Sequence, residues 1–130
     1  MAASSATLHE DPAKLSGETV DNHRAIVSLM EELEAVDWYS QRMEACENAE
    51  LAALLAHNRN EEEEHFAMVL EWLRRRDANL DTQLKTYLFK EGSIIAAEGG
   101  AADGAAGAAS DGSLGIGSLR GIGSLDVAGS

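Results

Sequence analysis

Several features that define large classes of protein are scarce in this sequence of 130 residues. The single cysteine, Cys46, excludes an internal disulfide or a thiolate cluster within one chain, and is typical of a reducing compartment. Only 10 residues are Lys or Arg, against 23 Asp or Glu, so the formal charge is −13. Nucleic-acid binding is not expected, because cationic side chains are needed to neutralise phosphates. Such an acidic chain suits the handling of cations.

Long apolar runs are also missing. No stretch of 18 or more apolar residues occurs, so we expect no helix that spans a membrane. The first ten residues have neither the basic region nor the apolar region of a signal peptide, so we expect none. Together with the single cysteine, these absences favour a protein of the cytoplasm.

Glycine is concentrated at one end of the chain. Ten of the 12 glycines lie in residues 99–130, where Gly, Ala and Ser fill 22 of 32 positions and no aromatic residue occurs. Because such a segment buries too little apolar surface to offset the entropy of ordering, we predict a disordered tail. The sequence thus divides into a flexible N-terminal segment (1–16), a helical domain (17–98), a flexible linker (99–112) and a tail (113–130).

The tail repeats a short motif. Gly-Ile-Gly-Ser-Leu occurs at 115–119 and again at 121–125. Isolated leucines and isoleucines in a glycine-rich segment have no core of their own chain to join. The repeat therefore predicts docking in a groove of another protein. The alternative is a low-complexity tail without a partner.

The remaining sequence predicts an all-α fold. It has one proline, Pro12, and two glycines, and it is rich in the helix formers Ala, Leu, Glu, Met and Arg. Apolar residues at helical spacing predict two long helices over about 18–46 and 49–76, with Asn48 as N-cap of the second. A short third helix is predicted over about 80–89. The short connection makes the long helices an antiparallel hairpin.

A hairpin of two helices has no enclosed centre and leaves one long face open. Chains this small usually need a partner to complete a core. We therefore expect self-association, in which two hairpins dimerise into a ferritin-like four-helix bundle.

Polar residues that interrupt the apolar stripes predict a metal site. On the second helix Glu62 and His65 are three residues apart, so both can point at one ion. On the first helix Glu32 lies on the inward side, where an uncompensated carboxylate is costly. Two copies of this set, from four helices, would make a di-iron carboxylate site. The donors suit iron or manganese, with zinc as a competitor. The alternative is that the acidic run 61–64 is a solvated face.

Two further acidic groups are candidates for weaker cation binding. Glu31 and Glu34 share another face of the first helix, and their copies would form an acidic cluster that attracts cations. His57, Glu61 and Glu64 follow one another at helical spacing and could form an outer cation site. For both groups the alternative is an exposed acidic face, and for the second group the spacing favours that alternative.

At this level of detail the sequence resembles the encapsulated ferritins. The resemblance covers most of residues 8–91. In one-letter code, the motifs that carry it are HRAIVSL at 23–29, EELEAVDWY at 31–39, AHNR at 56–59, EEEEH at 61–65 and LEWLRR at 70–75. The segment DGSLGIGSLR at 111–120 is similar to an encapsulin-targeting peptide. The second copy of the tail repeat is unusual for that family.

The resemblance implies a two-helix protomer whose dimer builds a ferroxidase centre, with Glu32, Glu62 and His65 of both subunits as iron ligands. It implies that Glu31 and Glu34 line the entrance for iron. Family members assemble further, typically into a decamer of five dimers. They oxidise Fe(II) to Fe(III), which an encapsulin shell then stores.

The resemblance also implies a peripheral metal site at His57, Glu61 and Glu64. Zn, Mn or Ca are possible substitutes for Fe at these sites. The location it implies is an encapsulin nanocompartment in a bacterial or archaeal cytoplasm. The alternative function is a non-catalytic iron-binding or assembly module that is carried as encapsulin cargo.

Overall fold

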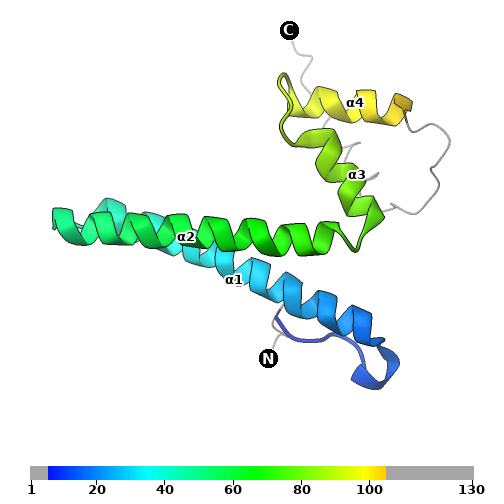
Figure 1. Ribbon diagram of the computed structural model, residues 1–130, viewed down its shortest axis with the longest axis horizontal. Helices are drawn as coiled ribbons and strands as arrows, with labels where there is room; N and C mark the ends of the chain where they lie inside the picture. The colour runs from blue at the N-terminus through cyan, green and yellow to red at the C-terminus, as the bar shows by residue number, and fades with distance from the viewer. Residues whose placement is uncertain (1–5, 105–130) are drawn as a thin grey trace, which may run out of the picture. The chain divides into compact units, whose positions relative to one another are not determined.

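The computed structural model describes residues 6–104, and every regular element in that range is a helix (Figure 1). The elements are a short 3₁₀ helix η1 (Pro12–Lys14) and the helices α1 (Gly17–Ala45), α2 (Ala49–Arg74), α3 (Ala78–Tyr87) and α4 (Ile94–Gly104). The prediction of an all-helical chain is confirmed for this range. The described residues divide after Leu84 into two compact units. No helix among them is both long and apolar enough for a membrane span.

The two long helices begin at side-chain caps. Ser16 Oγ accepts a hydrogen bond from the Thr19 amide at 3.1 Å and so begins α1. Asn48 Oδ1 accepts one from the Leu51 amide at 2.8 Å and begins α2, so the predicted N-cap is confirmed. Three residues separate the two helices, and α1 and α2 pack along each other as the predicted antiparallel hairpin (Figure 1).

The hairpin buries very little of its own apolar surface. Of the described apolar side chains only Leu73, at 8% exposure, is buried. Many large apolar side chains on the two long helices are exposed: Ile26, Met30, Leu33, Trp38, Leu51, Leu54 and Met68. Leaving so much apolar surface in water is unfavourable, and such surfaces mark sites of protein association. This distribution supports the expectation that a second chain completes the core.

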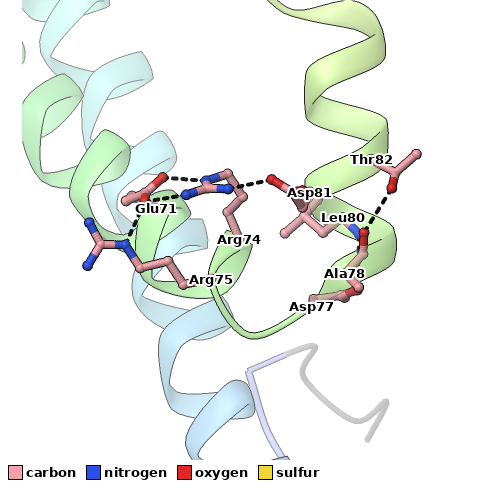
Figure 2. Close-up of polar contacts among 8 residues, drawn as sticks. All are labelled: Glu71, Arg74, Arg75, Asp77, Ala78, Leu80, Asp81 and Thr82. Carbon is pink, nitrogen blue, oxygen red and sulfur yellow. Dashed lines mark hydrogen bonds and ion pairs between the residues drawn. The ribbon is translucent and has the colours of Figure 1, made fainter.

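The third helix is tied to the end of α2 by side chains (Figure 2). Arg74 donates two hydrogen bonds to the Glu71 carboxylate, at 2.6 and 2.8 Å, and a third to Asp81 in the first turn of α3. Asp77 begins α3, because its Oδ1 accepts a hydrogen bond from the Leu80 amide at 3.0 Å. We call Glu71, Arg74 and Asp81 the α2–α3 clasp.

Some helix ends differ from those predicted. The second helix ends at Arg74 rather than 76, because the Arg76 amide turns to the Leu73 carbonyl at 3.0 Å, an i→i−3 bond. The third helix begins and ends two residues earlier than predicted. After it, Phe89 takes a positive φ of 57°, which is uncommon for a residue other than Gly.

The fourth helix was not predicted at all. Ser93 caps it, since Ser93 Oγ accepts a hydrogen bond from the Ala96 amide at 3.2 Å, and alanine favours its continuation. It includes residues 99–104 of the stretch expected to be a flexible linker. The rest of that linker and the tail at 113–130 lie outside the described residues.

Candidate metal centre

Three side chains from the two long helices meet at one point of the hairpin. Glu32 comes from α1, and Glu62 and His65 come from α2. Each offers a ligand atom, and the three atoms all lie within 4.8 Å of one another. His65 Nδ1 is 3.3 Å from Glu62 Oε2 and 3.7 Å from Glu32 Oε2. Within residues 6–104 this is the one group of three or more such ligands that is close enough to hold a metal ion.

The backbone explains why these three residues converge. Glu62 and His65 are one helical turn apart, so their side chains leave α2 from neighbouring positions. Glu32 faces them because the hairpin places the middle of α1 beside the middle of α2. The two carboxylates are about three-quarters shielded, with side chains 23% and 24% exposed, while the imidazole is 49% exposed. The group therefore opens to the surface on the side of His65.

The charges of the three groups are strongly linked. The pKa of Glu32 is raised, first because its carboxyl shares a hydrogen bond with Glu62 and second because it is partly buried. The same hydrogen bond lowers the pKa of Glu62. The pKa of His65 is raised, mainly by its hydrogen bond to the Glu62 carboxylate. The two carboxyls that face each other across the hairpin therefore have pKa values shifted in opposite directions.

The donor set fits a transition-metal ion. Two carboxylate oxygens and one imidazole nitrogen are ligands that iron, manganese and zinc all accept. Neighbouring carboxylates that repel each other without a cation are stabilised when a divalent ion lies between them. Three donors from one chain leave coordination positions open. Those positions are available to further ligands or to a reactant.

The other residues predicted from the sequence do not join this group. Glu31 and Glu34 lie on exposed positions of α1. His57 Nε2 is 2.9 Å from Glu61 Oε1, one turn apart on the exposed face of α2. Glu64 is exposed and belongs to no group of three ligands within the described range. In this structure the peripheral set is a His57–Glu61 pair.

Sequence reasoning missed a cation–π contact at the C-terminal end of α2. Arg76 folds back over Trp72, with its guanidinium carbon 3.7 Å from the ring centroid. Its Nη1 also donates a hydrogen bond to the Trp72 carbonyl at 3.0 Å. The i, i+4 spacing of a tryptophan and an arginine was the available signal. Trp38 and Arg42 on α1 have the same spacing and a looser contact of 5.9 Å.

Comparison with known protein families identifies the family to which this chain belongs. The sequence profile of a family described as EncFtn-like matches residues 7–91. The chain belongs to the EncFtn-like family. The match takes in both long helices, the three clustered ligands and α3.

Curated relatives of this EncFtn-like chain agree with the assignment. It is 58% identical over 127 residues to the encapsulated ferritin-like protein of Rhodospirillum rubrum, covering 98% of this chain and 89% of the relative. It is 47% identical over 90 residues to the ferritin-like protein of Thermotoga maritima, covering 69% of this chain and 79% of that relative. The resemblance to encapsulated ferritins that the motifs indicated is thereby confirmed.

A solved structure supports the fold of this EncFtn-like chain. The crystal structure of protein NE0167 from Nitrosomonas europaea superimposes with a TM-score of 0.65 and 59% sequence identity. The superposition covers 67% of this chain and 96% of that one. The helical hairpin is therefore the shared architecture of a close relative.

Proposed function

We propose that the protein is a ferroxidase, which oxidises Fe(II) to Fe(III) at a di-iron site formed between two subunits. The observation that carries this proposal is the convergence of Glu32, Glu62 and His65 within 4.8 Å, at an opening on the surface of the hairpin. Fe(II) is the substrate of this reaction. The names of the relatives, encapsulated ferritin-like and ferritin-like protein, support the same activity.

Two chains are needed for the site to be complete. One chain supplies two carboxylates and one imidazole, whereas di-iron carboxylate bundles use two such sets drawn from four helices. The exposed apolar side chains of α1 and α2 supply a surface on which a second hairpin can pack. We propose that the dimer is the unit of the site and that five dimers form a ring.

The residues of the site do three things in this proposal. Glu62, whose pKa is lowered, binds the incoming cation first. Glu32, on the facing helix, supplies the second carboxylate, so that two carboxylates hold the metal. His65 binds as a neutral imidazole and leaves positions open for the oxidant, which accepts the electron that each Fe(II) loses. Carboxylate oxygens also favour the harder Fe(III) over Fe(II).

Acids outside the site would supply it with iron. Glu31 and Glu34 are exposed on α1 within one turn of Glu32, so their negative potential raises the local concentration of cations. We propose them as the entrance for iron. The pair His57 and Glu61, with Glu64 one turn further on, is the proposed peripheral site, where Zn, Mn or Ca would also bind.

The tail at 113–130 is proposed to dock the protein in an encapsulin shell. Its doubled Gly-Ile-Gly-Ser-Leu motif supports this role, as does the alignment with an encapsulated relative over 98% of the chain. The protein would then work in an encapsulin nanocompartment, and the shell would store the Fe(III) that the open helical scaffold cannot enclose.

Fe(II) oxidation by the full chain tests the proposal. The rate is followed by the absorbance of Fe(III) above the background of aerobic oxidation, for the natural chain and for Glu62→Ala. The matched control is Glu63→Ala, which removes a neighbouring exposed acid that lies 3.9 Å from Arg59. We expect Glu62→Ala to fall to background and Glu63→Ala to keep the natural rate. Stoichiometric iron binding without oxidation above background would instead identify a non-catalytic iron-binding cargo.

A further inference from the structure

The turn between α3 and α4 carries the most exposed apolar side chains of residues 6–104. Phe89 is 101% exposed, Ile95 82% and Ile94 72%, and no other large apolar side chain in that range is as exposed as these three. Leu88, at 38% exposure, precedes them in the same turn. Exposed apolar side chains that lie so close together in the sequence mark a site of association. We call Leu88, Phe89, Ile94 and Ile95 the apolar corner.

The backbone of the apolar corner holds Phe89 in an unfavourable conformation. Its φ of 57° lies in the left-handed region, which is uncommon for a residue as bulky as phenylalanine. Such a conformation persists only where the surroundings stabilise it. The fully exposed side chain shows that nothing in residues 6–104 covers the ring. A contact from outside these residues is therefore needed to offset the strain.

The helix α4 also lacks a partner in its own compact unit. This unit begins at Lys85, and its described part holds the last residues of α3 and the whole of α4. A lone helix of 11 residues is marginal in water, because helices shorter than about 12–15 residues gain too little to offset the cost of nucleation. A segment that packed on Ile94 and Ile95 would stabilise the first turn of α4.

The tail of the same chain offers a segment of matching chemistry. Its motif Gly-Ile-Gly-Ser-Leu occurs twice, whereas one copy is enough to enter a groove of a shell. We propose that the second copy, residues 121–125, folds back and packs its isoleucine and leucine on the apolar corner. The first copy, residues 115–119, then remains available to the shell. This last assignment rests on the proposed function, whereas the fold-back itself needs neither iron nor a shell.

The length of the tail suits this fold-back. Residues 105–120 join the end of α4 to the second copy, and a flexible segment of that length has an r.m.s. reach of about 20–24 Å. The tail must return along α4, whose 11 residues rise about 16 Å. A tether whose reach is close to the span gives a high effective concentration. Docking within one chain is therefore favoured over docking between chains in dilute solution.

The charges that flank the motif favour the second copy over the first. A tail that returns from the end of α4 passes Glu98 before it reaches the apolar corner and Lys90 after it. The second copy is preceded by Arg120 and followed by Asp126, so opposite charges meet at both of its ends. The first copy is followed by Arg120, which would place two cations together at Lys90. Lys90 is exposed and forms no ion pair within residues 6–104, so it can accept a carboxylate partner.

Amide hydrogen exchange of α4 tests the fold-back. Exchange in residues 94–104 is measured on the full chain without shells, for the natural sequence and for the double variant Ile122→Ser, Leu125→Ser. The matched control is Ile116→Ser, Leu119→Ser, which makes the same changes in the first copy. We expect exchange about tenfold faster in the second-copy variant and unchanged exchange in the control. Equal exchange in all three chains, or equal acceleration in both variants, would overturn the inference.

The same measurement distinguishes other occupants of the apolar corner. Protection of α4 that rises with protein concentration would show that a second copy of the chain covers the corner. Protection that appears only when empty shells are added would show that the shell covers it. Either result would overturn the fold-back, which predicts protection that depends on neither.

Charge reversal tests the direction in which the tail packs. The variants are Lys90→Glu, Asp126→Lys and the two together, followed by the same exchange measurement. Each single reversal should make exchange in α4 about threefold faster, and the double reversal should restore the natural rate. Glu91→Gln, which neutralises the neighbouring exposed acid, is the control and should leave the rate unchanged. Additive acceleration in the double variant would overturn the proposed direction.

Loading of co-expressed shells separates this inference from the proposed function. We expect loading to be lost in the first-copy variant and largely retained in the second-copy variant. If exchange in α4 changes as expected but neither variant alters loading, docking of the tail in the shell is refuted and the fold-back stands. Loss of loading in the second-copy variant alone would overturn the assignment of the two copies.

Discussion

Glu32 and Glu62 face each other across the hairpin, one from each long helix, and their ligand oxygens lie within 4.8 Å of each other. Interaction between the two carboxyls raises the pKa of Glu32 and lowers that of Glu62. Two carboxyls this close are stabilised either by a proton between them or by a cation. In the proposed site the same two residues would therefore join the helices in the free chain and hold the metal in the loaded one.

The replacement Glu32→Gln separates these two tasks. The amide of glutamine can still donate to Glu62, so the hairpin should fold, but it cannot become a carboxylate. We expect metal affinity to fall by at least about tenfold, with Fe(II) oxidation lost in proportion. Anaerobic titration calorimetry with Fe(II) measures the first and stopped-flow absorbance the second. Asp37→Asn, an exposed acid of α1 that accepts a hydrogen bond from Gln41 at 3.0 Å, is the control and should change neither.

The α2–α3 clasp predicts how firmly the third helix is held. Arg74→Ala removes every contact of the clasp, because Arg74 is the residue that joins Glu71 to Asp81. We expect amide hydrogen exchange in residues 78–84 to become roughly two- to fivefold faster, as is usual for partly exposed ion pairs. Arg75→Ala is the matched control, since it removes a partner of Glu71 and leaves Asp81 paired. Equal acceleration in the two variants would contradict the role of the clasp.

Acidification should weaken the ion pairs that Glu71 forms with Arg74 and Arg75. The guanidinium of Arg74, with that of Arg75, lowers the pKa of Glu71 from 4.5 to about 2. A carboxyl whose pKa is lowered on folding adds stability at pH values above its unfolded pKa, and this stability is lost as the pH falls toward the folded pKa. The natural chain should therefore be more heat-stable than Glu71→Gln at pH 7. The difference should shrink between pH 4.5 and 2, and thermal melts followed by circular dichroism would show it. If the difference in melting temperature between the natural chain and Glu71→Gln grew on acidification, the predicted stabilisation by Glu71 would be contradicted.

Removal of residues 113–130 tests the proposal that iron oxidation and docking in the shell are carried by different segments of the chain. The ligands and both long helices lie in residues 17–74, so Fe(II) oxidation should be unchanged. Retention inside co-expressed encapsulin shells should be lost, and this is measured by the amount of cargo that co-purifies with intact shells. Deletion of 121–125 alone leaves one copy of the motif and should retain part of the loading. Full loading without 113–130 would show that another part of the chain carries the docking signal.

The hairpin could be predicted because its determinants are local. Asn48 stands before a run of helix formers and after a predicted helix, and its side chain caps α2 as expected. Glu62 and His65 are one turn apart in any helix, so their proximity follows from spacing alone. The position of Glu32 opposite them followed from its inward place on the first helix and from the short connection, which fixes the register of the hairpin.

The features that sequence reasoning missed depend on contacts across a turn or on competing preferences. Arg74 and Asp81 are seven residues apart, with a helix end between them, so no helical spacing pairs them. The helix α4 begins at the Ser93 cap and continues through alanines into Gly99 and Gly100, whose presence argued for a linker. Overall composition thus outweighed a local cap in the prediction, whereas in the structure the cap and the alanines determine the conformation.

Leu73 is the one buried apolar side chain in the described part of the hairpin. If two hairpins associate as proposed, their folding equilibrium depends on concentration. When most apolar burial comes from a second molecule, mass action governs how much of the chain is folded, and the melting temperature rises as the solution is made less dilute. Confinement of many copies in a small volume would then increase the folded fraction of the chain. A chain released into a large volume without metal would lose structure and activity together.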